Sequence, residues 1–166
     1  MSLWDYSNAV QFPYGDDVTY IKGMEWLNGC AVVEDWGCGT AFAEQFCTGS
    51  YRGVDGAPSK YTWKVADLRT YTSKVPGIFM RHVLEHNIEW ELILRNALES
   101  FTQRMCLIIF TPFGVVTHDL SDAVIPDLSF AEGDLHPLLD PYLVGYDDLS
   151  TGTQYGVERI YYLEQG

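Results

Sequence analysis

The stretch at residues 32–41 constrains the fold of this chain more than any other part of it. Two valines begin it and favour a buried strand, and Asp35 follows them. Gly37 and Gly39 then stand one residue apart. Such glycines let the backbone turn tightly and let a ligand approach it, while a helix beginning behind them offers free N–H groups. The stretch predicts a strand that delivers an acid and turns at once into a short helix at 40–46.

Apolar runs of strand length alternate with helical or turn segments along the rest of the chain. A helical stripe of Val18, Ile21 and Trp26 follows two aspartates, and a long helix is expected after Asn87, which can cap it. The run 105–110 is unbroken apolar residues, as in a parallel strand covered on both faces. Further strands are expected at residues 30–33, 51–55, 63–66, 77–80, 142–146 and 157–163.

This alternation predicts a single α/β domain over residues 1–166, with a mostly parallel sheet closed by a hairpin-like pair of strands. The segment 56–62, which joins the second and third strands, is too short for a full crossover helix. We therefore expect one flanking helix to be reduced.

Acidic residues also follow the second and third strands. Asp55 stands twenty residues after Asp35, and Asp67 comes directly after the third strand. With these residues the chain resembles the class I S-adenosylmethionine-dependent methyltransferases, whose first motif reads acid-x-Gly-x-Gly-x-Gly. The motif is followed from Asp35 to Gly39 and departs at Ala41, which replaces the third glycine. Residues 81–86, Arg-His-Val-Leu-Glu-His, are similar to the segment after the fourth strand of that family.

The resemblance implies a three-layer, Rossmann-like methyltransferase fold with a mostly parallel seven-stranded sheet and a reversed last strand. It implies S-adenosylmethionine as the cofactor, with Asp55 on the ribose, the glycine turn on the methionine side, and Asp67 with Leu68 on the adenine. The full set of cofactor residues it implies is Asp35, Gly37, Cys38, Gly39, Asp55, Gly56, Asp67, Leu68 and Arg81.

The implied activity is an enzymatic methyl transfer to an O, N or C nucleophile, most simply on a small molecule. A base is useful where the acceptor carries a proton, and His118, oriented by Asp119, is the first candidate. His82 and His86 are alternatives. A different class of function is also open: a cofactor-binding, non-catalytic interaction subunit, favoured by Ala41 and the small size. A partner subunit that completes the pocket is open as well.

Two competing interpretations of the motifs are weaker. A nicotinamide-dinucleotide fold needs a glycine where Phe42 stands. The run from His82 to His86 fits the His-x-x-Glu-His pattern of a zinc-peptidase class, in which both histidines bind the metal and Glu85 is the base. That pattern needs His82 inside a helix, whereas this segment directly follows a strand, so we expect no metal.

The net charge and the cysteine content limit the classes of binding partner and the location that we expect for this protein. A net charge of −13 and a pI of about 4.4 disfavour nucleic acid, which is bound mainly through Lys and Arg. The longest apolar run is too short for a membrane span, and the beginning of the chain lacks the pattern of a signal peptide. The four cysteines form no Cys-x-x-Cys pair, which argues against a disulfide framework or a cysteine zinc site. We expect a cytoplasmic protein.

Two surface features leave alternatives open. No Lys or Arg occurs from residue 105 to residue 158, where acids are frequent, so an acidic rim could favour a neutral or cationic acceptor or a basic protein partner. The same acids could simply form a solvated face. The aromatic N-terminal segment could close over the site as a lid, but we favour ordinary packing on the sheet edge for its members Trp4, Tyr6, Phe12, Tyr14 and Tyr20.

Overall fold

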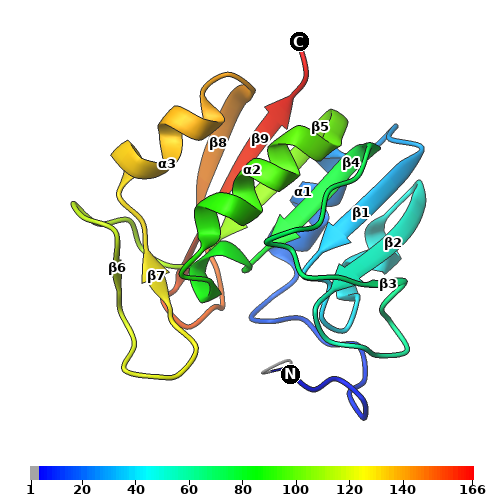
Figure 1. Ribbon diagram of the computed structural model, residues 1–166, viewed down its shortest axis with the longest axis horizontal. Helices are drawn as coiled ribbons and strands as arrows, with labels where there is room; N and C mark the ends of the chain where they lie inside the picture. Colours follow the sequence, from blue (N-terminus) through cyan, green and yellow to red (C-terminus); the bar gives the residue numbers. More distant parts are fainter. Residues whose placement is uncertain (1–3) are drawn as a thin grey trace.

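A seven-stranded sheet forms the centre of the computed structural model, which describes residues 4–166 (Figure 1). Its strands are β1 (Val32–Trp36), β2 (Ser50–Asp55), β3 (Lys64–Val65), β4 (Val75–Arg81), β5 (Phe101–Ile109), β8 (Leu143–Ser150) and β9 (Val157–Glu164). Their order across the sheet is β3-β2-β1-β4-β5-β9-β8. Strands β1 to β5 are parallel, and β9 runs antiparallel to both of its neighbours. The mostly parallel sheet with a reversed last strand is therefore confirmed.

Helices cover both faces of this sheet, which makes the fold three-layered (Figure 1). The helical segments are α1 (Val18–Trp26), α2 (Trp90–Ser100), α3 (Glu132–Leu139) and the 3-10 turns η1 (Phe42–Phe46) and η2 (Leu84–His86). A separate antiparallel ribbon joins β6 (His118–Asp119) to β7 (Leu128–Ser129). Within residues 4–166, no helix combines the length and apolar character needed to cross a membrane.

Strand β5 shows how the layers are held together. Met105, Leu107 and Ile109 are buried in the core that the sheet shares with α2 and α3. Cys106 and Ile108, which alternate with them, are buried in the second core, on the α1 and η1 side. Side chains alternate between the two faces of a strand, so an unbroken apolar run fills both cores. The prediction of a strand covered on both faces is confirmed.

The helix expected at 40–46 is replaced by the single 3-10 turn η1. Ala41, just before it, takes a left-handed conformation with φ 56°, so a regular right-handed helix cannot include it. The connection after Asp55 has no helix, as expected, and neither does the connection from β3 to β4. The flanking helices are therefore reduced on more than one connection.

Helix α1 lies where the sequence predicts it but buries a different stripe. Tyr20 and Met24 face the sheet, while Val18, Ile21 and Trp26 are only partly buried. The Trp26 indole N–H donates to the backbone carbonyls of Met105 and Leu163, 3.1 and 3.3 Å away, which holds the ring at the rim of the sheet.

The long helix predicted after Asn87 is α2. It begins at Trp90 and ends at Ser100, and the next residue, Phe101, begins β5. Asn87 donates from its side chain to the Val83 carbonyl, 2.6 Å away, and does not cap the helix.

Candidate functional site

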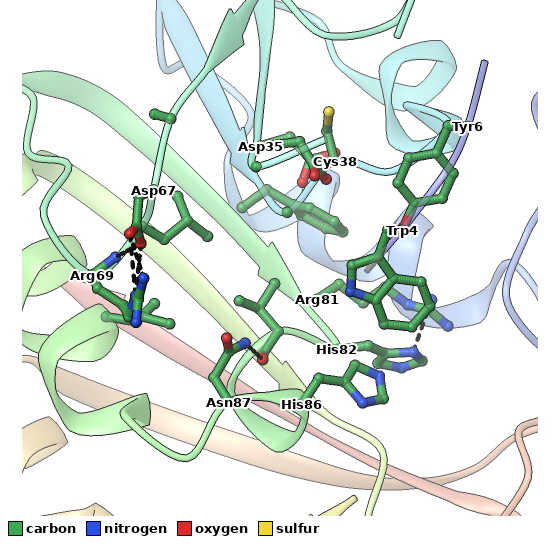
Figure 2. Close-up of a pocket in the computed structure, with 18 of the residues that line it drawn as sticks. Trp4, Tyr6, Asp35, Cys38, Asp67, Arg69, Arg81, His82, His86 and Asn87 are labelled. Carbon is green, nitrogen blue, oxygen red and sulfur yellow. Dashed lines mark hydrogen bonds and ion pairs between the residues drawn. The ribbon is translucent and has the colours of Figure 1, made fainter. Parts of the chain in front are cut away.

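A cavity of about 680 Å³ opens at the sheet edge where the parallel strands end (Figure 2). Asp35 lies near the end of β1, and Asp55 and Arg81 are the last residues of β2 and β4. Parallel strands present their carboxyl ends at one edge, which is where ligands bind in such sheets. The cavity is lined by every predicted cofactor residue except Gly39: Asp35, Gly37, Cys38, Asp55, Gly56, Asp67, Leu68 and Arg81.

The glycine turn forms one wall of the cavity. Gly37 and Gly39 both have positive φ, at 79° and 51°, and the Gly37 N–H donates to the Val54 carbonyl at 2.7 Å. A Cβ atom at Gly37 would lie 2.4 Å from a methyl carbon of Val83. Glycine is therefore required there by both the backbone conformation and the space. Gly39 is buried and is not part of the lining, and its N–H donates to Asp55.

Asp55 is fixed by the backbone of both adjoining loops. One carboxylate oxygen accepts the Gly39 N–H at 2.9 Å, and the other accepts the Ala57 N–H at 2.8 Å. Burial raises the pKa of this carboxyl, and the backbone donors act in the opposite direction. Each oxygen keeps a lone pair, so the carboxylate can still accept two hydroxyl groups from the cavity side.

Asp35 and Cys38 form the deep wall of the cavity. Asp35 accepts a hydrogen bond from the Tyr51 hydroxyl at 2.5 Å, and burial raises the pKa of its carboxyl to about 7. Burial also raises the pKa of the Cys38 thiol far above its ordinary value, so this cysteine is a neutral, unreactive group.

Asp67 lies at the cavity but is paired within the protein. Its carboxylate binds the Arg69 guanidinium at 2.7 Å, and Arg69 also binds Glu89 at 2.7 Å. The hydrogen bonds from Arg69 lower the pKa of the Asp67 carboxyl. The carboxylate must therefore share its lone pairs with Arg69 if it is to contact an adenine, whereas Leu68 offers an apolar side chain beside it.

Arg81 lies at the cavity wall, but the N–H groups of its guanidinium bind other residues of the protein. Its guanidinium binds Glu158 at 2.9 Å, the Thr19 hydroxyl at 2.9 Å and the Tyr14 carbonyl at 2.8 Å. It also lies 4.0 Å from the centre of the Tyr20 ring. The geometry gives Arg81 a structural role, and a direct contact to a cofactor stays a prediction.

His82 belongs to the same buried network. Its Nε2 lies 2.5 Å from Glu158 and its Nδ1 lies 3.4 Å from Arg81, so both ring nitrogens have protein partners. Burial lowers the pKa of this imidazole to about 4, although the Glu158 hydrogen bond opposes the shift. His82 therefore has no free nitrogen for an acceptor.

His82, Glu85 and His86 are not arranged as the ligands and base of a zinc site. Glu85 is fully buried and accepts the Phe110 N–H at 2.7 Å, and burial raises the pKa of its carboxyl to about 8. His82 and His86 have different partners, because their segment is a strand end and a 3-10 turn rather than one helix. No group of three metal-ligating side chains occurs in the part of the chain that the structure describes.

His118, the first candidate base, is not brought to the cavity. It lies on the exposed ribbon strand β6, and its Nδ1 contacts the Val116 carbonyl at 2.8 Å. The segment after β5 instead contributes Ile125 and Pro126 to the lining. A catalytic role for His118 stays a prediction that its position does not favour. His86 does line the cavity.

The N-terminal aromatic residues are the main part of the site that sequence reasoning misplaced. Trp4, Tyr6, Tyr14 and Tyr20 line the cavity, so ordinary packing on the sheet edge is the wrong prediction for Trp4, Tyr6 and Tyr14, whereas Tyr20 both packs against the sheet and lines the cavity. Figure 2 places Trp4 and Tyr6 beside the cavity. The signal was present as an unusual density of aromatic residues, but nothing in the sequence tells whether such residues cover a strand or a ligand.

The acids of residues 105–158 do not form one rim. Glu158 is buried, and Asp127 contacts His86 and Tyr155. Others form ion pairs with Arg159 and Lys22 or are exposed on loops. These acids are therefore dispersed over several elements. Of these acids, two contact cavity-lining residues: Asp127 contacts His86, and the buried Glu158 contacts Arg81 and His82.

No family model matches the sequence, and no curated protein matches it. Solved structures do match. Magnesium protoporphyrin IX methyltransferase from Synechocystis PCC 6803, solved with bound S-adenosylhomocysteine, is 16% identical with a TM-score of 0.67, and the match covers 97% of this chain and 91% of that one. The 1,6-didemethyltoxoflavin-N1-methyltransferase of Burkholderia thailandensis is 15% identical with a TM-score of 0.66, over 89% and 77%. The N-methyltransferase NodS of Bradyrhizobium japonicum WM9 is 10% identical with a TM-score of 0.64, over 89% and 84%.

The strand order, the reversed β9 and these structural matches identify the fold. The chain has the fold of the class I S-adenosylmethionine-dependent methyltransferases.

Proposed function

We propose that this protein is an enzyme that transfers a methyl group from S-adenosylmethionine to an O, N or C nucleophile on a small molecule. The observation that carries the proposal is Asp55, a buried carboxylate at the end of β2 that faces the cavity beside the Gly37 turn. Structural neighbours with this fold are methyltransferases solved with S-adenosylmethionine or S-adenosylhomocysteine.

The residues present fit this cofactor. The cavity has the volume of sites that enclose a small-molecule ligand, and each oxygen of Asp55 has a lone pair left for a ribose hydroxyl. Asp55 and Gly56 would hold the ribose, the Gly37–Cys38 turn the methionine side, and Leu68 with Asp67 the adenine. The bound cofactor would supply a methyl group already activated by the positive charge on its sulfur.

Given that activation, the task of the protein is to align the acceptor and to exclude water. The acceptor should be neutral or cationic. Both arginines of the lining, Arg69 and Arg81, are already paired with carboxylates, which leaves no cationic side chain there to balance an anionic acceptor.

The alternative is a subunit that binds the cofactor without turnover. Ala41 in place of the third glycine still favours it, but its Cβ is accommodated in a left-handed conformation. A cofactor-binding subunit would take up S-adenosylmethionine and form no S-adenosylhomocysteine with any acceptor or partner protein.

Three further aspects belong to the proposal. Residues 1–166 would act as one domain, since strands from both ends of the chain share one sheet. A cytoplasmic location agrees with the four cysteines, none of which is in a disulfide. A partner subunit could complete the acceptor side, where the loop after β5 carries exposed apolar residues.

The first test is calorimetric titration with S-adenosylmethionine, S-adenosylhomocysteine and NADH. Both sulfur ligands should bind. Asp55→Ala should weaken their binding by about 1.5–3 kcal/mol, or roughly tenfold or more in affinity. Asp122→Ala, which removes an exposed acid from a loop, is the matched control. Circular dichroism melting checks that each variant is folded. A folded protein that binds neither sulfur ligand would contradict the proposal.

A further inference from the structure

The contacts of His86 fix which of its ring nitrogens carries the proton. Its Nδ1 lies 3.0 Å from the Pro126 carbonyl oxygen and 3.4 Å from a carboxylate oxygen of Asp127. A carbonyl oxygen only accepts hydrogen bonds, so Nδ1 must be the protonated nitrogen. In the neutral imidazole, Nε2 then carries a lone pair.

This Nε2 is available to a ligand. Among the described residues it has no hydrogen-bond partner, and the His86 side chain is 20% exposed at the wall of the cavity. The ring lies 5.5 Å from the ring of Trp4. Figure 2 places His86 and Trp4 apart from Asp67 and Arg69, at another end of the cavity.

The ring is also held in place from behind. Phe110, just after β5, packs 5.4 Å from it. Asp127 is itself held by the Tyr155 hydroxyl, which donates to its second oxygen at 2.9 Å. A histidine at a cavity wall whose Nδ1–H is bound by an acceptor and whose Nε2 has no protein partner has the arrangement of a general base. His82 and His118 lack it, for the reasons given above.

We propose that His86 is the catalytic base for a hydroxyl group on a flat, uncharged ring, and that Asp127 is its positioning residue. The inference rests on the proposed function and narrows its acceptor. A neutral amine already has a nucleophilic lone pair, whereas a hydroxyl is a weak nucleophile until its proton is removed. The aromatic faces of Trp4 and Tyr6 suit a flat ring.

The hydroxyl proton moves to Nε2 of His86 while an oxygen lone pair forms the bond to the methyl carbon. The carbon–sulfur bond breaks, and its electron pair stays on sulfur and cancels the positive charge there. The imidazolium that forms lies against the Asp127 carboxylate and afterwards releases its proton to solvent.

The first test needs no turnover. Long-range ¹H–¹⁵N spectra of the histidine rings report which nitrogen is protonated, and the signals of His86 are those that vanish in His86→Gln. We expect the Nδ1–H form with a bare Nε2 in the wild-type protein. Finding the Nε2–H form would overturn the proposal, because that nitrogen could not accept a proton.

The second test uses phenol, 4-chlorophenol and 4-nitrophenol as acceptors. His86→Gln should slow methylation of phenol by about 10²-fold or more, and that of 4-nitrophenol much less, because the acidic phenol ionises without help. Asp127→Asn should lower kcat with KM little changed, while Asp122→Asn should match the wild type. Equal losses across the series would assign His86 a structural role instead.

Calorimetry distinguishes a failure of the hydroxyl-acceptor inference from a failure of the proposed function. Cofactor binding without methylation of any of the three phenols would overturn the hydroxyl-acceptor inference and leave the proposed function standing. Absence of cofactor binding by the folded wild-type protein would overturn both.

Discussion

Left-handed backbone conformations gather where the strands end at the cavity. Gly37, Gly39 and Ala41 follow β1, and His82 follows β4 with φ 57°. Residues with side chains resist this region, and such strain is kept where the surrounding structure fixes it, often at functional sites. At single-residue scale the cavity edge therefore depends on backbone geometry as much as on charge.

Gly37→Ala should be strongly destabilising. The new Cβ would lie 2.4 Å from a Val83 methyl group, at a φ of 79° that alanine resists. We expect a loss of about 2–4 kcal/mol in the free energy of unfolding, measured in urea. Gly133→Ala is the matched control, since no atom lies within 4 Å of its added Cβ in α3. That variant should be as stable as the wild type or up to about 1 kcal/mol more stable. Equal stabilities of the two variants would contradict the prediction.

Glu85 should make stability depend on pH. Burial raises the pKa of its carboxyl from 4.5 to about 8 in the folded state, and one of its oxygens has no hydrogen-bond partner among the described residues. The folded protein holds this proton more tightly than the unfolded chain. The stabilisation is thus complete below the unfolded pKa and is lost as the pH rises through about 8.

Glu85→Gln tests this directly, because an amide cannot ionise and its oxygen can still accept the Phe110 N–H. From pH 5 to pH 8, the stability of the variant should rise relative to the wild type by on the order of 2–4 kcal/mol in urea unfolding. Glu91→Gln, an exposed change on α2, should show no such trend. A difference between variant and wild type that is constant with pH would refute the assignment.

At the scale of elements, apolar pattern and glycine spacing were sufficient for the sheet. The β5 run alternates between two cores, and Asp35 and Asp55 lie at or near the ends of adjacent strands, as the apolar runs and the glycine spacing predict. The loops were not predictable in the same way. Whether His118 reaches the cavity depends on how the segment between β5 and α3 folds, and that fold is set by tertiary contacts such as the Thr111 hydroxyl donating to the Leu128 carbonyl at 2.6 Å.

The N-terminal segment should control ligand retention more than stability. Trp4 and Tyr6 line the cavity, and neither belongs to the two main cores. Replacing both with alanine should weaken binding of S-adenosylhomocysteine about tenfold in calorimetry and speed its release in stopped-flow measurements. The free energy of unfolding should change by less than about 1 kcal/mol.

Phe12→Ala is the matched control for that variant. Phe12 is a partly exposed aromatic of the same segment, packed 4.7 Å from Tyr14 and outside the cavity lining. Its removal should leave ligand affinity unchanged. Equal effects of the two variants would mean that the segment acts through general packing rather than by covering the cavity.

At the scale of the whole molecule, one buried polar network joins segments far apart in the chain. Arg81 at the end of β4 contacts Thr19 on α1 and Glu158 on β9, so the cavity edge is tied to the reversed strand and to one covering helix. Burial alone would raise the pKa of the Glu158 carboxyl, but His82 and Arg81 outweigh it and lower that pKa. The ionised pair is therefore the folded form.

Removing one partner of this ion pair should lower the free energy of unfolding far more than removing both partners together. Arg81→Met leaves the fully buried Glu158 charge without its cation, and we expect a loss of about 3–5 kcal/mol in urea unfolding. The double variant Arg81→Met/Glu158→Met removes both charges and should regain most of that loss, which a double-mutant cycle measures as coupling. Glu164→Gln breaks the exposed pair with Arg104 on the neighbouring strands and should cost less than about 1 kcal/mol. Additive effects of the two single substitutions would show that the ions are stabilised independently, and the network would then not connect the cavity to β9.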